Sequence, residues 1–221
     1  MLITNIEKTK KGRFSIFVDD EFYCALHVEV FALSGIRINE DFPQEKLEEL
    51  KKESERKITR DRALKLLSAK DYSKKNLIEK LLKYGEEDIC KETADKMEDL
   101  GLINDYDYAM RLARDLHNLK GYGNNRIKMY LFEKGINHAI ADEAVSQFDD
   151  DEQHEKIMEI LIKKCKTDLT DRKEKEKMFA KLMRMGYKSG EIKTAINEFI
   201  ENEQQEMWYN GKSRNGIFRM C

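Results

Sequence analysis

A motif that recurs at intervals of 50 and 51 residues restricts this chain to a repeat architecture. Each copy has a leucine followed four residues later by a glycine: Leu81 with Gly85, Leu131 with Gly135, and Leu182 with Gly186. An apolar residue precedes each leucine by one helical turn (Leu77, Ile127 and Met178), and an alanine follows each glycine by nine residues (Ala94, Ala144 and Ala195).

Each part of this motif has a structural reason. Apolar residues four positions apart form a buried stripe on one helix. A glycine one turn later supplies the left-handed conformation that ends the helix, so we expect positive φ at Gly85, Gly135 and Gly186. The small alanine lets the next helix approach closely. The motif therefore predicts units of three helices.

Three such units are expected, at residues 58–104, 105–148 and 149–203. Their helices are predicted at 61–69, 74–84 and 87–100, then at 105–118, 124–134 and 138–148, and finally at 151–166, 172–185 and 189–202. We expect three of them to be N-capped by Ser73, Asp151 and Ser189. Units of this size stabilise one another by stacking, so we predict an elongated, curved body.

The composition agrees with a mostly α-helical fold made of thin layers. Charged residues make up 38% of the chain, and the only breakers are 11 glycines and one proline. Such a chain has too little apolar material for one thick core but enough for helices with solvated outer faces.

The two ends of the chain differ from the repeats. Residues 1–57 are predicted to form a β-rich cap with linking helices. Alternating apolar residues at 14–18 and 22–26 flank an Asp19-Asp20 turn and predict a hairpin. Ile3 and Ile6 suggest another strand, and short helices are predicted at 28–33 and 44–56. The cap serves either to cover the helices or to contact a partner. Residues 204–221 show no helical period and are expected to be a tail, disordered or otherwise.

A string in the middle unit resembles the signature of the RecX family. It comprises Asn104-Asp105, Tyr108-Ala109, Gly121-Tyr122-Gly123, Arg126-Ile127, Leu131 and Lys134-Gly135-Ile136. The first unit carries a similar set around Tyr72, and the β segment is similar to the extension of RecX proteins from low-GC Gram-positive bacteria. The resemblance covers residues 1–203, although Asn104-Asp105 replaces the usual acidic pair and residues 204–221 match nothing in the family.

The resemblance implies a regulator that binds the filament of the RecA recombinase, inhibits its ATPase and strand exchange, and has some affinity for single- or double-stranded DNA. This places the chain in DNA repair, homologous recombination and the SOS response. The mechanism expected is insertion into the filament groove, where the chain would bridge several protomers and gain avidity. The rival hypothesis is a helical-repeat DNA-binding protein that acts without a recombinase.

The sequence lacks the motifs of an enzyme, so we expect no catalysis and no cofactor. Neither a phosphate loop, a dinucleotide fingerprint, a nucleophile elbow nor a zinc-protease pair is present. The four histidines lack ligand spacing, so no metal is expected. Cys24, Cys90, Cys165 and Cys221 have no CxxC pair and are interpreted as reduced structural thiols. We expect a cytoplasmic monomer without a membrane segment.

Two basic stretches are candidates for partner binding. Residues 111–134 carry a net charge of +4 and residues 163–184 carry +5. The functional hypothesis is that both line one concave face, and the alternative is an ordinary solvated helix surface. The predicted partner-binding residues are Arg111, Arg114, Tyr122, Arg126, Lys128, Lys134, Lys173, Lys177 and Lys181. Tyr122 also fits a role in helix packing. We expect Arg126→Glu combined with Lys128→Glu to weaken inhibition of the recombinase without unfolding the protein.

Overall fold

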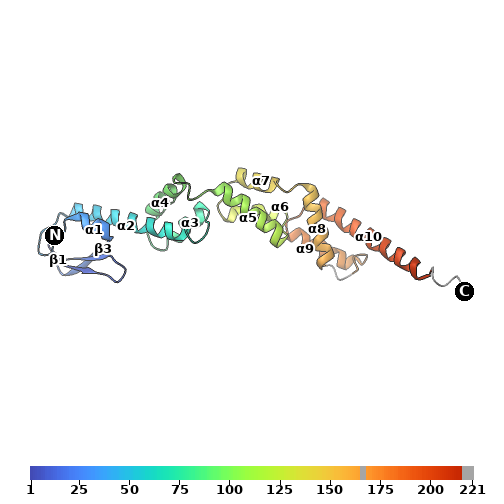
Figure 1. The fold of residues 1–221 in the computed structure, drawn as a ribbon, viewed down its shortest axis with the longest axis horizontal. Helices are drawn as coiled ribbons and strands as arrows, with labels where there is room; N and C mark the ends of the chain where they lie inside the picture. Colours follow the sequence, from blue (N-terminus) through green and yellow to red (C-terminus); the bar gives the residue numbers. More distant parts are fainter. Residues whose placement is uncertain (165–167, 216–221) are drawn as a thin grey trace. The chain divides into compact units, whose positions relative to one another are not determined.

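The structure is a computed structural model that describes residues 1–164 and 168–215 (Figure 1). In the predicted third unit, Cys165 and Lys166 lie outside the described residues. Residues 216–221 of the predicted tail, which include Cys221, also lie outside them. The chain divides into two compact units, Met1–Asn104 and Asp105–Cys221. The described residues form ten helices and three strands, which confirms the mostly α-helical fold with a small β region.

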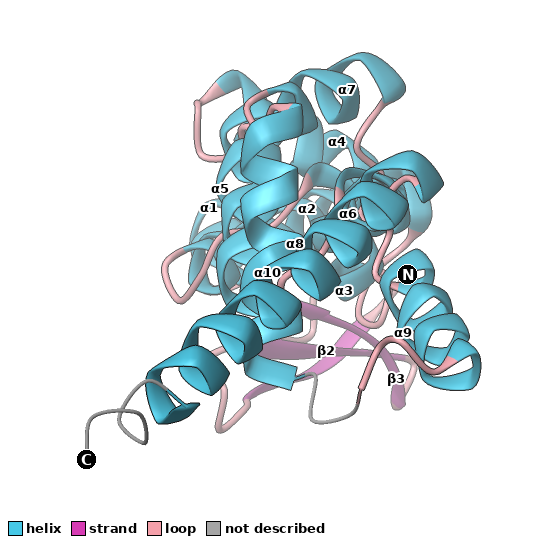
Figure 2. Cartoon of the chain, turned by 90° about the vertical axis from the view of Figure 1, so that its right-hand side faces the viewer, coloured by secondary structure: helices cyan, strands magenta, loops and turns pink. Residues whose placement is uncertain are grey.

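The strands, drawn in magenta in Figure 2, form one antiparallel sheet in the first unit. β1 (Ile3–Lys8), β2 (Phe14–Val18) and β3 (Glu21–Leu26) lie in the order β1-β2-β3. Asp19 and Asp20 connect β2 to β3 with φ of 49° and 69°, the two positive values that a two-residue hairpin turn needs. The predicted hairpin and the additional strand are thus confirmed.

Helices cover one side of this sheet because three strands alone bury too little apolar surface. α1 (Val28–Ser34) ends at Gly35, whose φ is 70°. Pro43 then caps α2 (Gln44–Leu67), and Leu47 of α2 is fully buried in a core with Ile3, Ile16 and Leu26.

α2 corrects the prediction of two separate helices at 44–56 and 61–69. It is one helix of 24 residues, because no glycine or proline interrupts residues 57–60. The predicted boundary between residues 57 and 58 therefore falls inside α2. The N-terminal half of α2 packs on the sheet, and Ala63 in its C-terminal half belongs to the core of the first repeat.

The first repeat is completed by α3 (Lys74–Leu81) and α4 (Glu87–Asp99). In the second unit, the second repeat consists of α5 (Asp105–Lys120), α6 (Asn124–Glu133) and α7 (His138–Ser146). The third repeat consists of α8 (Asp150–Lys164), α9 (Arg172–Arg184) and α10 (Ser189–Asn215). Each repeat has a separate apolar core.

The repeat positions occupy equivalent buried sites. The three motif leucines and the three alanines are all fully buried: Leu81, Leu131, Leu182, Ala94, Ala144 and Ala195. Gly135 and Gly186 have φ of 82° and 93°, and the residue after each donates its amide to the motif leucine, as predicted for a left-handed helix end.

Gly85 is an exception, because its φ does not lie in the left-handed region. α3 ends earlier, at Leu81, and Gly85 instead lies between α2 and α4. A Cβ atom at Gly85 would lie 3.2 Å from Thr59 Oγ1 and 3.5 Å from Cys90 Sγ. This glycine is required by close packing, which a local sequence motif does not reveal.

The helix ends require further corrections. Ser73 caps α3 as predicted, since its side chain accepts from the Asn76 amide. Asp149 rather than Asp151 accepts at the start of α8, and Ser189 is already the first residue of α10. α10 continues to Asn215, thirteen residues beyond the predicted end at 202, because residues 203–210 contain neither glycine nor proline. The prediction of a non-helical tail is therefore wrong for residues 204–215.

Candidate functional site

An arginine beside two stacked tyrosines forms a surface cluster in the second unit. The rings of Tyr122 and Tyr130 stack with centroids 5.7 Å apart. The Arg126 guanidinium lies 5.2 Å from the Tyr122 centroid and 5.7 Å from that of Tyr130. All three side chains are half-buried. Such a stack holds the guanidinium in one orientation by cation–π attraction.

Local sequence places these three side chains together. Arg126 and Tyr130 are one turn apart on α6 and therefore share a face. Gly121, with φ of 66°, ends α5, and the amide of Tyr122 then donates to the Leu116 carbonyl at 3.1 Å. Gly123 caps α6, so Tyr122 is held at the point where the chain reverses.

The cluster is attached to the third repeat. Arg126 Nη1 donates to the Arg184 carbonyl at 3.2 Å, while its Nε is buried without a hydrogen-bond partner. The second contact is made by main chain: the Gly123 amide donates to the Met185 carbonyl at 2.8 Å and the Asn125 amide to the Gly186 carbonyl at 3.2 Å. Arg126 therefore has a structural role at the end of α9.

Glycines allow this contact between the second and third repeats. A Cβ at Gly123 would lie 2.7 Å from the Gly186 carbonyl carbon, and a Cβ at Gly186 would lie 2.4 Å from the Arg126 amide nitrogen. Beside them, the buried Tyr187 hydroxyl donates to the Gly121 carbonyl at 2.9 Å. Burial raises the pKa of Tyr187, so this hydroxyl stays protonated and remains a donor. The two repeats are joined backbone to backbone.

A basic stripe runs along α9 toward this cluster. Lys173, Lys177, Lys181 and Arg184 follow one another at intervals of four, four and three residues, which places them on one helical face. Lys181 is half-buried and the other three are exposed. Lys177 pairs with Glu174 at 2.6 Å, and this hydrogen bond raises the pKa of Lys177. The α9 stripe and the Tyr122–Arg126–Tyr130 cluster meet at Arg184.

The other predicted residues face elsewhere. Lys128 forms an ion pair with Asp142 of α7 at 2.6 Å, and the hydrogen bond from Lys128 lowers the pKa of that carboxyl group. Because Lys128 follows Arg126 by two residues, the two point to opposite sides of α6. Arg114 Nε donates to Gln147 Oε1 of α7 at 2.7 Å. The structure thus does not bring Arg126 and Lys128 onto one face.

Arg111 and Lys134 complete the predicted set. Arg111 is exposed on α5 and donates to the Asp107 carbonyl at 3.3 Å, whereas Lys134 is half-buried and follows the last residue of α6. Tyr130 and Arg184 belong to the site but were absent from the predicted set. The sequence signal that could have found them is helical spacing, since Tyr130 follows Arg126 by four residues and Arg184 follows Lys181 by three.

Metal, membrane and thiol chemistry are the alternatives to partner binding. Within residues 1–164 and 168–215, no group of three or more His, Cys, Asp or Glu side chains is arranged to hold a metal ion. Among the described helices, none combines the length and apolar character needed to cross a membrane. Cys24 and Cys90 are buried free thiols. Burial raises the pKa of Cys24 to about 11 and also raises that of Cys90, so both remain protonated near neutral pH.

Comparisons with known proteins give a consistent result. Residues 1–42 match the family model "Regulatory protein RecX N-terminal domain", and residues 104–145 match "RecX, second three-helix domain". The chain is 29% identical to the regulatory protein RecX of Clostridioides difficile over 212 residues, which cover 93% of this chain and 99% of that protein. It is 27% identical to the protein of the same name from Clostridium botulinum strain Eklund 17B, covering 90% and 95% of the two chains.

Solved structures agree with these matches. A crystal structure described as regulatory protein RecX has the same fold, with a TM-score of 0.64, 22% identity and coverage of 91% of this chain and 98% of that chain. The crystal structure of RecX from Lactobacillus salivarius has a TM-score of 0.60 and is 30% identical, covering 66% of this chain and 97% of that chain. With its sheet, its three-helix repeats and its Tyr122–Arg126 motif, this chain belongs to the RecX family.

Proposed function

We propose that this protein regulates the RecA recombinase by binding the RecA–DNA filament and inhibiting its ATPase and strand exchange. The observation that carries the proposal is the match to regulatory RecX proteins over nine tenths of the chain. A binding protein rather than an enzyme is also favoured by the site, which offers cations and stacked aromatic rings but no paired acid and base.

The α9 stripe is the part of the site that we assign to the partner. Its lysines are presented on a regular helix, which fixes their spacing, and no carboxylate pairs with Lys173 or Lys181 in the part of the chain that the structure describes. Acidic protein surface or DNA phosphate would complement this stripe. Arg126 supports it by holding the end of α9 rather than by contacting the partner freely.

The test is a titration of RecA ATPase on single-stranded DNA with this protein as the variable. We expect inhibition at less than one molecule per RecA protomer. Lys173→Glu with Lys181→Glu should raise the concentration required for half inhibition at least tenfold, by reversing two charges on one face. Lys52→Glu with Lys96→Glu, a control with the same charge change in the first unit, should have little effect.

Variants of Arg126 are less suitable for this test. A carboxylate at position 126 would face the Arg184 carbonyl and would disturb the contact between repeats, so a loss of inhibition would not identify a partner contact. Lys128→Glu opposes Asp142 and carries a related risk. No inhibition of RecA ATPase at any ratio would refute the proposed function. Equal inhibition by the α9 variant and the wild type would remove the stripe from the contact surface.

A further inference from the structure

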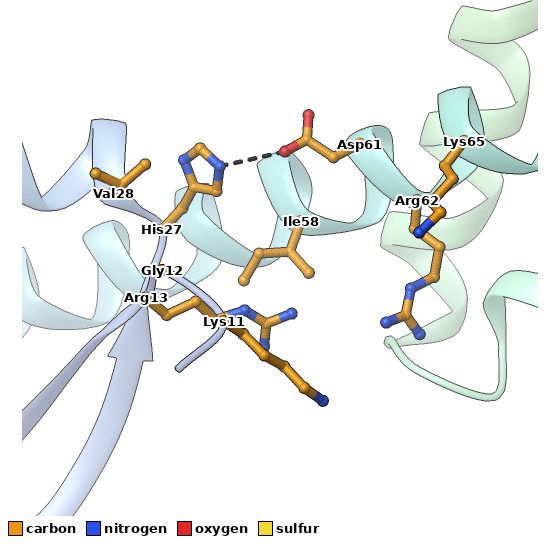
Figure 3. Close-up of a pocket in the computed structure, with 9 residues that line it drawn as sticks. All are labelled: Lys11, Gly12, Arg13, His27, Val28, Ile58, Asp61, Arg62 and Lys65. Atoms are coloured by element: carbon orange, nitrogen blue, oxygen red, sulfur yellow. Dashed lines mark hydrogen bonds and ion pairs between the residues drawn. The ribbon is translucent and has the colours of Figure 1, made fainter. Parts of the chain in front are cut away.

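A basic cavity of about 340 Å³ lies in the first unit, far along the sequence from the α9 stripe. The turn between β1 and β2 supplies Lys11 and Arg13, and α2 supplies Arg62 and Lys65 (Figure 3). Ile58 and Val28 line it as well, next to His27 and Asp61. Figure 3 shows the two arginines approaching the space beside Ile58 from opposite sides.

The charge of this cavity is strongly unbalanced. Asp61 is the one carboxylate among its lining residues, against four cations. Asp61 is also engaged, because its Oδ2 lies 3.2 Å from Nε2 of His27. Nδ1 of His27 accepts from the Glu29 amide, so Nε2 carries the proton and donates to Asp61. None of the four cations has an ion-pair partner within the described part of the chain.

The guanidinium of Arg62 is held against an aromatic ring beside the cavity. Its guanidinium carbon lies 3.5 Å from the centroid of the Tyr84 ring, and its Nη1 is buried without a hydrogen-bond partner. A buried guanidinium N–H without an acceptor is costly. Arg62 as a whole is only half-buried and lines the cavity, so it can meet a phosphate oxygen there, since guanidinium groups match the geometry of phosphate.

Tyr84 indicates which phosphate compound would bind. Arg62 covers one face of its ring, yet the residue is 66% exposed, which leaves the other face open to solvent. An exposed ring next to a phosphate-binding cavity is the combination used to bind single-stranded nucleic acid, because unpaired bases stack on aromatic rings while the backbone follows cations. A duplex keeps its bases stacked internally and would not use this ring.

We infer that the first unit has its own binding site for single-stranded nucleic acid, with a phosphodiester held by Arg13, Arg62, Lys11 and Lys65 and a base stacked on Tyr84. The site lies on residues other than those proposed for RecA contact. It does not depend on the proposed function, because it binds the strand in the absence of the recombinase.

The test measures binding of a fluorescein-labelled 20-nucleotide thymidine strand, and of a 20-base-pair duplex, by the full chain without RecA. Lys11→Gln with Arg13→Gln should weaken single-strand binding about tenfold. The variant should also reduce the slope of log affinity against log salt by about 0.7 for each phosphate that it no longer neutralises. Tyr84→Leu should weaken single-strand binding at least fivefold and leave duplex binding unchanged.

The matched control is Lys52→Gln with Lys96→Gln, which removes two exposed cations of the first unit outside the cavity. An equal decrease of affinity in this control would show non-specific charge attraction and overturn the site, as would unchanged binding by the Lys11/Arg13 variant. Unchanged single-strand binding by Tyr84→Leu would overturn the stacking contact.

A direct readout separates this site from any contribution of the second unit. Phenylglyoxal modifies accessible arginines, and peptide mass mapping reports each one. The thymidine strand should protect Arg13 from modification, and equal labelling with and without the strand would overturn the inference. A normal ATPase titration combined with no protection would leave the RecA proposal intact, so the two failures are distinguishable.

Discussion

The contact between Gly123 and Gly186 predicts a large effect for a single methyl group. Gly123 has an ordinary φ of -79°, so Gly123→Ala introduces no backbone strain. Its Cβ would lie 2.7 Å from the Gly186 carbonyl carbon and would have to move by about 0.7 Å to reach a normal contact of 3.4 Å. That movement separates the two main chains where the Gly123 amide meets the Met185 carbonyl at 2.8 Å.

The expected cost follows from these contacts. Two main-chain hydrogen bonds of about 1 kcal/mol each are weakened, and the packing around Tyr187 is loosened as well. The unfolded state has less conformational entropy with alanine than with glycine, and this difference offsets about 0.5 kcal/mol of the lost stability. We therefore expect Gly123→Ala to lower the free energy of unfolding of the second unit by about 2–3 kcal/mol, measured by urea titration with far-ultraviolet circular dichroism.

Two other glycines serve as controls for this measurement. Gly101 has φ of +69°, and a Cβ there would have no neighbouring atom within 4 Å, so Gly101→Ala tests backbone strain alone, about 1 kcal/mol, read from the unfolding of the first unit. Gly190 lies in α10 with neither constraint, and Gly190→Ala should stabilise by about 0.5 kcal/mol. A Gly123→Ala variant as stable as the wild type, or less affected than Gly101→Ala, would refute the steric reasoning.

Two further predictions concern the second unit. Gly135→Val should destabilise it by more than about 2 kcal/mol, because a β-branched residue resists the φ of 82°; an unchanged melting temperature would contradict the role of Gly135 in ending α6. His117 stacks on Phe148 with centroids 4.2 Å apart, and burial lowers its pKa below 6.5. The unfolded state then binds the proton more readily, so stability is complete above pH 6.5 and declines as pH falls toward the folded pKa. His117→Gln should remove this decline in urea titrations at pH 7.5 and 5.5, and an equal decline in both proteins would assign it to other groups.

Much of the fold is readable from local patterns. The Asp19-Asp20 turn, the alternation of β2 and the leucine and alanine positions of the three repeats all depend on residues near one another in sequence, and all are confirmed. They are predictable because a hairpin turn, a helical stripe and a left-handed helix end impose their residue preferences within a few positions.

The candidate site was predicted less completely, because its geometry depends on which helices pack together. Arg126 and Lys128 are close in sequence, yet one contacts α9 and the other α7. Both charge runs were visible in the sequence, but net charge over a stretch does not report the side of the helix from which each cation projects.

By itself, the sequence determined the repeat, its helices and the turn chemistry that separates them, since these arise from interactions within one turn or one hairpin. Only the tertiary structure decided the roles of Gly85 and Gly123, and it alone joined Arg13 to Arg62 across one cavity. The physical reason is that close backbone approach and charge clustering depend on atoms brought together from distant segments, and their distances are set by packing.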